Sequence, residues 1–91
     1  MLTVFKYQLP LGDYFKLALP KGARVLTADM QNGQPCLWAL INPDNKTEKR
    51  LFRFVGTGQM IEDSLKRLEF VATFQMEGGS LTLHIFEVKE S

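Results

Sequence analysis

Hydrophobic and polar residues alternate along most of this chain, in short runs that end at glycine, proline, asparagine or aspartate. Because successive side chains of a strand point to opposite faces of a sheet, this period of two predicts β-strands. The pattern predicts about seven of them, at residues 2–9, 15–19, 23–31, 36–41, 49–55, 68–76 and 80–88. Strands this short must protect their edges, so the expected fold is all-β, a small antiparallel sandwich or barrel.

The residues between these runs indicate how neighbouring strands connect. Pro10 and Gly12-Asp13 turn the chain between the first two runs and predict that they form a hairpin pair. Asn32-Gly33 is the commonest signal for a tight type I′ hairpin turn. Gly78-Gly79 predicts another hairpin turn, between the last two strands.

Two segments carry a different pattern. Between Gly58 and Leu68 the hydrophobic residues Ile61, Leu65 and Leu68 are spaced i, i+4 and i+7, which predicts one short helix or helical loop. The run from Cys36 to Ile41 is apolar on both faces. This strand is therefore expected either to be central with both faces covered or to be partly exposed at an oligomer interface.

Alternation also predicts which side chains share a face of a strand. Phe52 and Phe54 lie opposite Arg53, so this arginine shares its face with the aliphatic residues Leu51 and Val55. In the run 68–76, one face is expected to carry every second residue, and that face is hydrophobic throughout: Leu68, Phe70, Ala72, Phe74 and Met76.

Length and composition then limit the function classes. The chain has 91 residues and 10.4 kDa, with 45% hydrophobic residues, which indicates a single domain over residues 1–91. A domain this small gains stability from self-association, so a homo-oligomer is expected. The formal net charge of +1 is too small for a general electrostatic grip on nucleic acid or on an anionic membrane. Nucleic acid is therefore not expected among the partners.

Three features of the sequence predict a cytoplasmic protein. The only cysteine, Cys36, cannot form an internal disulfide, which fits a reducing compartment. Met1 leads directly into an alternating segment without the features of an export signal. The longest uninterrupted apolar run, Cys36 to Ile41, is far shorter than the roughly 20 residues that cross a bilayer. The expected location is the cytoplasm, with no membrane partner.

Residue counts argue against catalysis and metal binding. His84 is the only histidine, so histidine-rich metal sites and relays of two histidines are excluded. Cys36 and His84 both fall within strands, with no third residue indicated to orient them. The carboxylates are scattered around turns, at no spacing that marks a catalytic pair. We expect no enzymatic activity, no metal and no cofactor.

The segment Gly56-Thr57-Gly58 offers the main candidate for ligand binding. Glycines let backbone N–H groups approach an anion closely, and Arg50 and Arg53 just upstream could pair with a phosphate there. The alternative is an ordinary strand-ending turn, because Gln59 stands where a phosphate-binding Walker loop has lysine. Arg50 and Arg53, interleaved with phenylalanines, equally describe a nucleic-acid platform or a strand with one buried face. Trp38 is either a core residue or a stacking platform for a ligand.

Three segments carry a resemblance to a known family: Pro20-Lys21-Gly22-Ala23-Arg24-Val25-Leu26, Gln31-Asn32-Gly33-Gln34-Pro35-Cys36-Leu37-Trp38-Ala39-Leu40 and Phe52-Arg53-Phe54-Val55-Gly56-Thr57-Gly58. They resemble a family of small uncharacterised phage and prophage proteins, a domain of unknown function. Tyr7, Phe70, Gly79 and His84-Ile85-Phe86-Glu87 fit the same outline, so the resemblance covers nearly the whole chain. It implies a phage setting, in which proteins of this size are often virion accessories, regulators or inhibitors of bacterial defence that act by binding.

The residues predict a non-catalytic binding protein, and the resemblance implies that it is a phage-type accessory protein that counters a host antiviral defence. One mode is sequestration of a small anionic, nucleotide-like signal at a subunit interface, which needs a basic, glycine-lined pocket. The residues expected there are Arg50, Arg53, Gly56, Thr57, Gly58 and Trp38. The alternatives are a virion structural or assembly protein, and an inhibitor that masks a host defence protein through an exposed patch.

Overall fold

The computed structural model describes residues 1–90 of the chain, with residue 77 described by its backbone only. It confirms an all-β fold of seven antiparallel strands. These are β1 (Thr3–Gln8), β2 (Tyr14–Pro20), β3 (Arg24–Gln31), β4 (Gln34–Ile41), β5 (Thr47–Gly56), β6 (Leu68–Met76) and β7 (Leu81–Val88). Two short 3₁₀ turns, η1 (Leu65–Arg67) and η2 (Glu77–Gly79), lie before β6 and before β7. Within residues 1–90, none of the helical segments is long and apolar enough to span a membrane.

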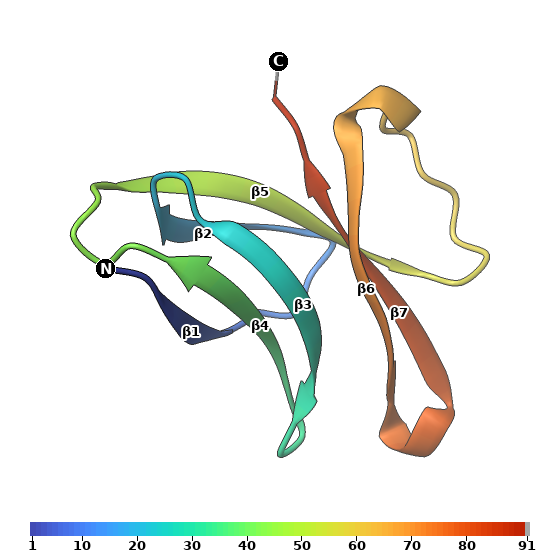
Figure 1. The fold of residues 1–91 in the computed structure, drawn as a ribbon. Coiled ribbons are helices and arrows are strands. Elements are labelled where there is room, and N and C mark those ends of the chain that lie inside the picture. The colour runs from blue at the N-terminus through green and yellow to red at the C-terminus, as the bar shows by residue number, and fades with distance from the viewer. Residues whose placement is uncertain (91) are drawn as a thin grey trace.

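The strands form two sheets that enclose the core between them (Figure 1). One sheet has three strands in the order β1-β4-β3, and the other has four in the order β2-β5-β7-β6. We refer to the face of each sheet that points away from the core as its outer face. The edge strands β3 and β6 contact each other, so the two sheets meet along one side of the sandwich (Figure 1).

The predicted hairpin between the first two strands is wrong. β1 pairs with β4 and β2 pairs with β5, so the two strands belong to different sheets. The connection between them carries Leu9, which is fully buried in the core and whose backbone N–H donates to Pro35 O at 2.9 Å. Burying this leucine draws the chain across from one sheet to the other. Proline and glycine signal that a turn occurs, but they do not specify which strands pair.

The other two predicted hairpins are confirmed. Asn32 and Gly33 join β3 to β4 with φ values of 52° and 77°, as a type I′ turn requires. Gly78 and Gly79 lie in η2 between the paired strands β6 and β7, and both also have positive φ. Local turn chemistry therefore fixed both connections.

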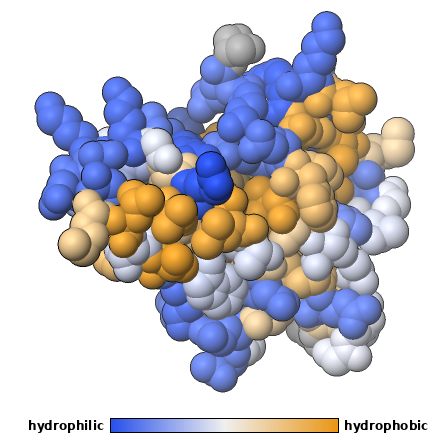
Figure 2. Space-filling model, viewed as in Figure 1, coloured by the Kyte–Doolittle hydropathy of each residue, from blue (hydrophilic) through white to orange (hydrophobic). Residues whose placement is uncertain are grey.

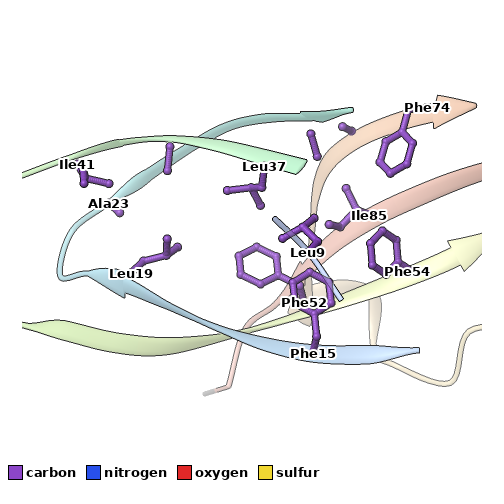
Figure 3. Packing of buried hydrophobic residues seen from close by; sticks show 13 residues of the cluster. Leu9, Phe15, Leu19, Ala23, Leu37, Ile41, Phe52, Phe54, Phe74 and Ile85 are labelled. Carbon is purple, nitrogen blue, oxygen red and sulfur yellow. The ribbon is translucent and has the colours of Figure 1, made fainter. Parts of the chain in front are cut away.

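The core lies between the two sheets and is rich in aromatic residues (Figure 3). Phe52 on β5 is inaccessible to solvent and stacks on Phe15 of β2, with ring centroids 5.3 Å apart. Leu37 and Ile41 of β4 point into the core from the opposite sheet (Figure 3). Burial of such side chains is the main source of stability for the sandwich.

The predicted hydrophobic face of β6 is wrong at its first residues. The register of β6 against β7 shifts between Phe70 and Ala72, which marks a β-bulge. Ala72 and Phe74 are buried, whereas Phe70 is 59% exposed and packs on Phe86 of β7 with ring centroids 5.9 Å apart. The extra residue of a bulge reverses the alternation, so residues on either side of it that are two apart point to opposite faces.

The predicted short helix over residues 58–68 reduces to the three residues of η1, Leu65–Arg67. Ser64 caps this turn, accepting a hydrogen bond from Lys66 N at 3.3 Å. Leu65, one of the residues on the expected apolar face, is exposed to solvent. The rest of the segment is an irregular loop, which a hydrogen bond from Arg53 to Asp63 ties to the outer face of the four-stranded sheet.

Candidate functional site

Arg53 lies on the outer face of β5, with its side chain covered by the loop that follows the strand. Its Nη1 donates to Asp63 Oδ1 at 2.8 Å and to Tyr14 Oη at 3.0 Å. Tyr14 Oη in turn donates to Asp63 Oδ1 at 2.6 Å, and the guanidinium stands over the Tyr14 ring at 4.8 Å from its centroid. The side chains of Arg53 and Asp63 are only 4% and 8% exposed, so the ion pair is buried. We call Tyr14, Arg53 and Asp63 the latch.

The latch holds Asp63 in its ionised form. The hydrogen bond from Tyr14 lowers the pKa of the Asp63 carboxyl, and the hydrogen bond and charge of Arg53 lower it further. Together these effects outweigh burial, which acts in the opposite direction. The same hydrogen bond raises the pKa of Tyr14, so the phenol remains protonated as the donor.

Arg50 lies on the opposite face of β5 and makes a second ion pair. Its Nε and Nη2 donate to Glu87 Oε2 and Oε1 at 2.7 and 2.8 Å, and its Nη1 donates to Ala23 O at 2.6 Å. Burial opposes ionisation of Glu87, but the hydrogen bonds and charge of Arg50 hold the pKa of its carboxyl below the usual value. This fork-shaped contact joins β5, β7 and the residue that precedes β3.

The structure therefore does not bring Arg50 and Arg53 together. They are three residues apart on one strand and point to opposite faces of the sheet, Arg50 with Phe52 and Phe54 toward the inner side and Arg53 toward the outer side. Each guanidinium already has a carboxylate partner. The expectation that Arg53 shares a face with Leu51 and Val55 is confirmed by the register of β5.

The turn Gly56-Thr57-Gly58 does not gather around either arginine. Thr57 Oγ1 is hydrogen-bonded to His84 Nε2 at 2.6 Å, and His84 Nδ1 to Thr73 Oγ1 at 2.8 Å. Gly58 has a φ of 89°, a backbone conformation that favours glycine and that turns the chain away from the direction of β5. Gly56 lines a separate, mostly apolar cavity of about 350 Å³ with Phe54, Leu81 and other residues. The turn thus serves as a strand end with a hydroxyl–imidazole contact.

Trp38 lies on the outer face of β4, between Lys6 of β1 and Thr27 of β3. It is half-buried, so neither predicted alternative, full burial in the core or an open stacking platform, describes it fully. The neighbouring residues of β4 alternate between the two faces: Leu37 and Ala39 face the core, and Leu40 shares the outer face with Trp38. β4 is therefore the central strand of its sheet, with one face in the core and the other partly exposed, whereas an oligomer interface on that exposed face stays a prediction.

A different cavity has the properties expected of an anion site. It has a volume of about 340 Å³ and lies where the turn between β2 and β3 meets the turn between β4 and β5. Its lining combines two cations, two amides and an apolar wall: Lys21, Arg24, Asn42, Asn45, Leu2, Leu40 and Gly22. We call it the Lys21–Arg24 pocket.

Backbone contacts between the two turns build this pocket. Lys21 N donates to Lys46 O at 2.7 Å, and Asn45 Nδ2 donates to Lys21 O at 2.9 Å. Asn42 Oδ1 accepts from Asp44 N at 3.1 Å, which leaves the amide NH₂ of Asn42 as a donor. Gly22 has a φ of 81° and open space where a Cβ would lie, so this residue lines the pocket with backbone atoms alone.

The positive charges of Lys21 and Arg24 have no carboxylate partner within residues 1–90. The side chains of both residues are exposed and make no ion pair or hydrogen bond with a described residue. This separates them from Arg50 and Arg53, each of which forms a close ion pair with a carboxylate. Two free cations beside a cavity form a local positive field that favours an anionic ligand.

Comparison with known protein families adds one assignment. The family described as Domain of unknown function (DUF7352) matches residues 1–91. The chain belongs to this family. The expected membership in a family of unknown function is thus confirmed over the whole chain, and the family description assigns no activity. No curated protein and no solved structure matches this DUF7352 chain significantly.

The sequence of this DUF7352 chain predicts the two turns that form the Lys21–Arg24 pocket, but not the pocket itself. Pro20-Lys21-Gly22 and Asn42-Pro43-Asp44-Asn45 each carry a turn signal, but 19 residues separate them along the chain. The signal that could have indicated this pocket is the presence of Lys21 and Arg24 close to Gly22. That the two turns meet follows from the β2–β5 pairing, which places Pro20 opposite Thr47. In residues 1–90, no group of three or more His, Cys, Asp or Glu side chains could hold a metal ion.

Proposed function

We propose that this DUF7352 protein is a non-catalytic binding protein that takes a small anionic ligand in the Lys21–Arg24 pocket. One observation carries the proposal: Lys21 and Arg24 are the cations that stand beside a cavity without a carboxylate partner among residues 1–90. Arg50 and Arg53, by contrast, are committed to Glu87 and Asp63. A bound anion would supply the acceptors that Lys21 and Arg24 lack.

The lining of the pocket favours a mononucleotide over a bare inorganic ion. Leu2 and Leu40 offer an apolar wall for a flat ring, Asn42 offers an amide donor, and the two cations suit a phosphate. The volume of about 340 Å³ falls within the range of roughly 300–1,000 Å³ for small-molecule sites, toward its lower limit.

The biological setting in our proposal is a phage protein that removes a nucleotide-like signal from a host defence pathway in the cytoplasm. Its support is the resemblance of the segments around Arg24, Trp38 and Gly56 to phage and prophage proteins. Binding alone would be sufficient for this role, because a stable complex lowers the free concentration of the signal without chemistry.

Titration calorimetry with AMP, inorganic phosphate and uncharged adenosine tests the proposal. We expect AMP to bind more tightly than phosphate, adenosine to bind weakly, and the AMP affinity to fall as salt is raised. Lys21→Ala and Arg24→Ala should each weaken AMP binding about tenfold, the equivalent of about 1.4 kcal/mol. Lys66→Ala is the matched control, because Lys66 is an exposed lysine on η1 that does not line the pocket.

Two results would contradict this assignment. The first is AMP binding that neither Lys21→Ala nor Arg24→Ala changes, and the second is no heat from any of the three probes. Native mass spectrometry of the protein purified from a bacterial host provides an independent readout, since it reports any small molecule that stays bound. A retained mass of nucleotide size that Arg24→Ala abolishes would support the pocket directly.

A protein-binding role is the second candidate, either as a virion structural or assembly protein or as an inhibitor that masks a host defence protein. The observation that favours it is the exposure of large apolar side chains on β1, which include Val4 and Phe5. Recovery of the protein in purified particles, with no small ligand bound, would support assembly over sequestration.

A further inference from the structure

β1 has a row of unpaired backbone groups on one side. It is the end strand of the order β1-β4-β3, and β4 is the one strand among residues 1–90 with which it pairs. The other edge strands are protected: β3 and β6 contact each other, and β2 carries exposed Lys16 and ends at Pro20, which has no N–H to donate. Of the four strand edges among the described residues, that of β1 is the one open to another strand.

The side chains of β1 offer no protection either. Val4 on the outer face is 50% exposed, and Phe5 on the inner face is 48% exposed. Lys6 is the only charged residue of the strand, and its Nζ reaches across the sheet to Gln31 Oε1, away from the free edge. Figure 2 shows hydrophobic residues gathered over β1 and the adjoining part of β4. A long apolar edge of this kind is a site for strand addition.

We propose that β1 pairs antiparallel with β1 of a second copy of this chain, which joins the two three-stranded sheets into one continuous sheet. A two-fold axis perpendicular to the sheet keeps the outer faces of both copies on the same side, so residues of equal parity lie opposite each other. The axis then passes beside one residue of β1, which lies opposite the same residue of the second copy. We call this residue the centre of the pairing, and it can be Val4, Phe5 or Lys6.

The sequence of β1 selects Phe5 as the centre of the pairing. A centre at Lys6 would place two lysines directly opposite each other, which repel. A centre at Val4 would pair only Thr3, Val4 and Phe5 within the strand, because Lys6 would lie beyond the partner's first strand residue. A centre at Phe5 pairs the strand from Thr3 to Tyr7 and brings the two half-exposed phenylalanines together.

The second copy is favoured as the occupant because the strand is complementary to itself. In the selected register Thr3 lies opposite Tyr7 and Val4 lies opposite Lys6, so Val4 meets the aliphatic stem of a lysine and the Tyr7 ring meets the methyl group of a threonine. The contact would also cover the side of the sandwich where Phe5 and Tyr7 lie, with ring centroids 6.4 Å apart. The proposal does not depend on anion binding in the Lys21–Arg24 pocket, and failure of the AMP titration would leave it intact.

Sedimentation equilibrium of the wild type and of charge variants at Phe5 tests the pairing. We expect a wild-type species of twice the 10.4 kDa chain mass. Phe5→Lys and Phe5→Glu should each weaken dimerisation by about tenfold or more, because like charges would meet at the two-fold axis. An equimolar mixture of the two variants should dimerise again, since opposite charges then face each other.

Phe70→Lys is the matched control, because Phe70 is a similarly exposed aromatic residue on the outer face of the other sheet and should leave dimerisation unchanged. Restored association in the mixture also demonstrates that both Phe5 variants are folded. A wild type that stays monomeric up to about 1 mM would overturn the proposal. So would Phe5 variants that dimerise like the wild type, or a mixture of them that fails to associate.

Discussion

Arg53 Nη1 donates to Asp63 Oδ1 at 2.8 Å, which ties the centre of a β-strand to a loop ten residues further along the chain. The contact gives a physical reason for the irregular loop that stands after Gly58 in place of the predicted helix. Asp63 must point back onto the sheet to meet a guanidinium that is buried on the outer face of β5. Without Asp63, the exposed Glu62 at 3.4 Å would be the one carboxylate among the described residues that is left to pair with the buried Arg53 charge.

We predict that Asp63→Ala lowers the free energy of unfolding by about 2–3 kcal/mol, because it leaves a buried guanidinium without its close carboxylate partner. Glu62→Ala is the matched control and should cost less than about 0.5 kcal/mol, since the Glu62 side chain is 79% exposed. Urea denaturation followed by circular dichroism measures both values. Equal losses for the two variants would mean that the latch does not contribute more than a surface ion pair.

Stability should fall on the acid side of neutrality. The pKa values of Asp63 and Glu87 are lower in the folded protein than in the unfolded chain, so the folded state gains most from these groups when both are ionised. Their contribution is complete above the unfolded pKa values of about 4 and is lost as the pH falls through the lower folded values. Unfolding free energies measured between about pH 7 and pH 2 should therefore decrease below about pH 5.

The Asp63→Asn variant serves as the control for this pH dependence. An amide cannot ionise, so the variant should be less stable at neutral pH and should show a shallower decrease toward acid. If wild type and variant lose stability in parallel, other carboxyl groups account for the acid dependence.

Arg50→Lys should destabilise the fold although it keeps the positive charge. Lysine cannot reproduce the two parallel hydrogen bonds to Glu87 together with the third to Ala23 O. We expect a loss of about 1–2 kcal/mol in the free energy of unfolding. Lys49→Arg on the same strand is a matched control that should be neutral, because Lys49 is exposed. A neutral Arg50→Lys would show that charge alone is required at this position.

Gly33→Ala should destabilise the turn between β3 and β4 by about 1 kcal/mol, because its φ of 77° is unfavourable for a residue with a side chain. Gly56→Ala is the matched control: its φ lies outside the left-handed region, and a Cβ there would meet its nearest neighbour, Gln59 Oε1, at 3.9 Å. That variant should be neutral or slightly stabilising. Thermal denaturation of both variants gives the comparison, and a Gly33→Ala protein as stable as the wild type would contradict the strained turn.

The candidate site shows how far sequence reasoning extends. An anion site needs free cations beside glycines, and in the sequence this pattern indicates Arg50, Arg53 and Gly56-Thr57-Gly58. Parity along β5 already separates the two arginines, since residues three apart in a strand point to opposite faces. The carboxylates that pair with them come from residues 63 and 87, and no local pattern around the arginines announces those contacts.

The sequence by itself determined the all-β class, the approximate strands, and the turns at Asn32-Gly33 and Gly78-Gly79. These depend on side-chain alternation and on backbone conformations that only a few residue types adopt, both of which are local properties. Tertiary structure decided that β1 and β2 belong to different sheets, that a bulge turns Phe70 outward, and that the Lys21 turn meets the Asn42–Asn45 turn. Each of these depends on which distant residues are buried together, because long-range packing selects among pairings that the local pattern leaves equally possible.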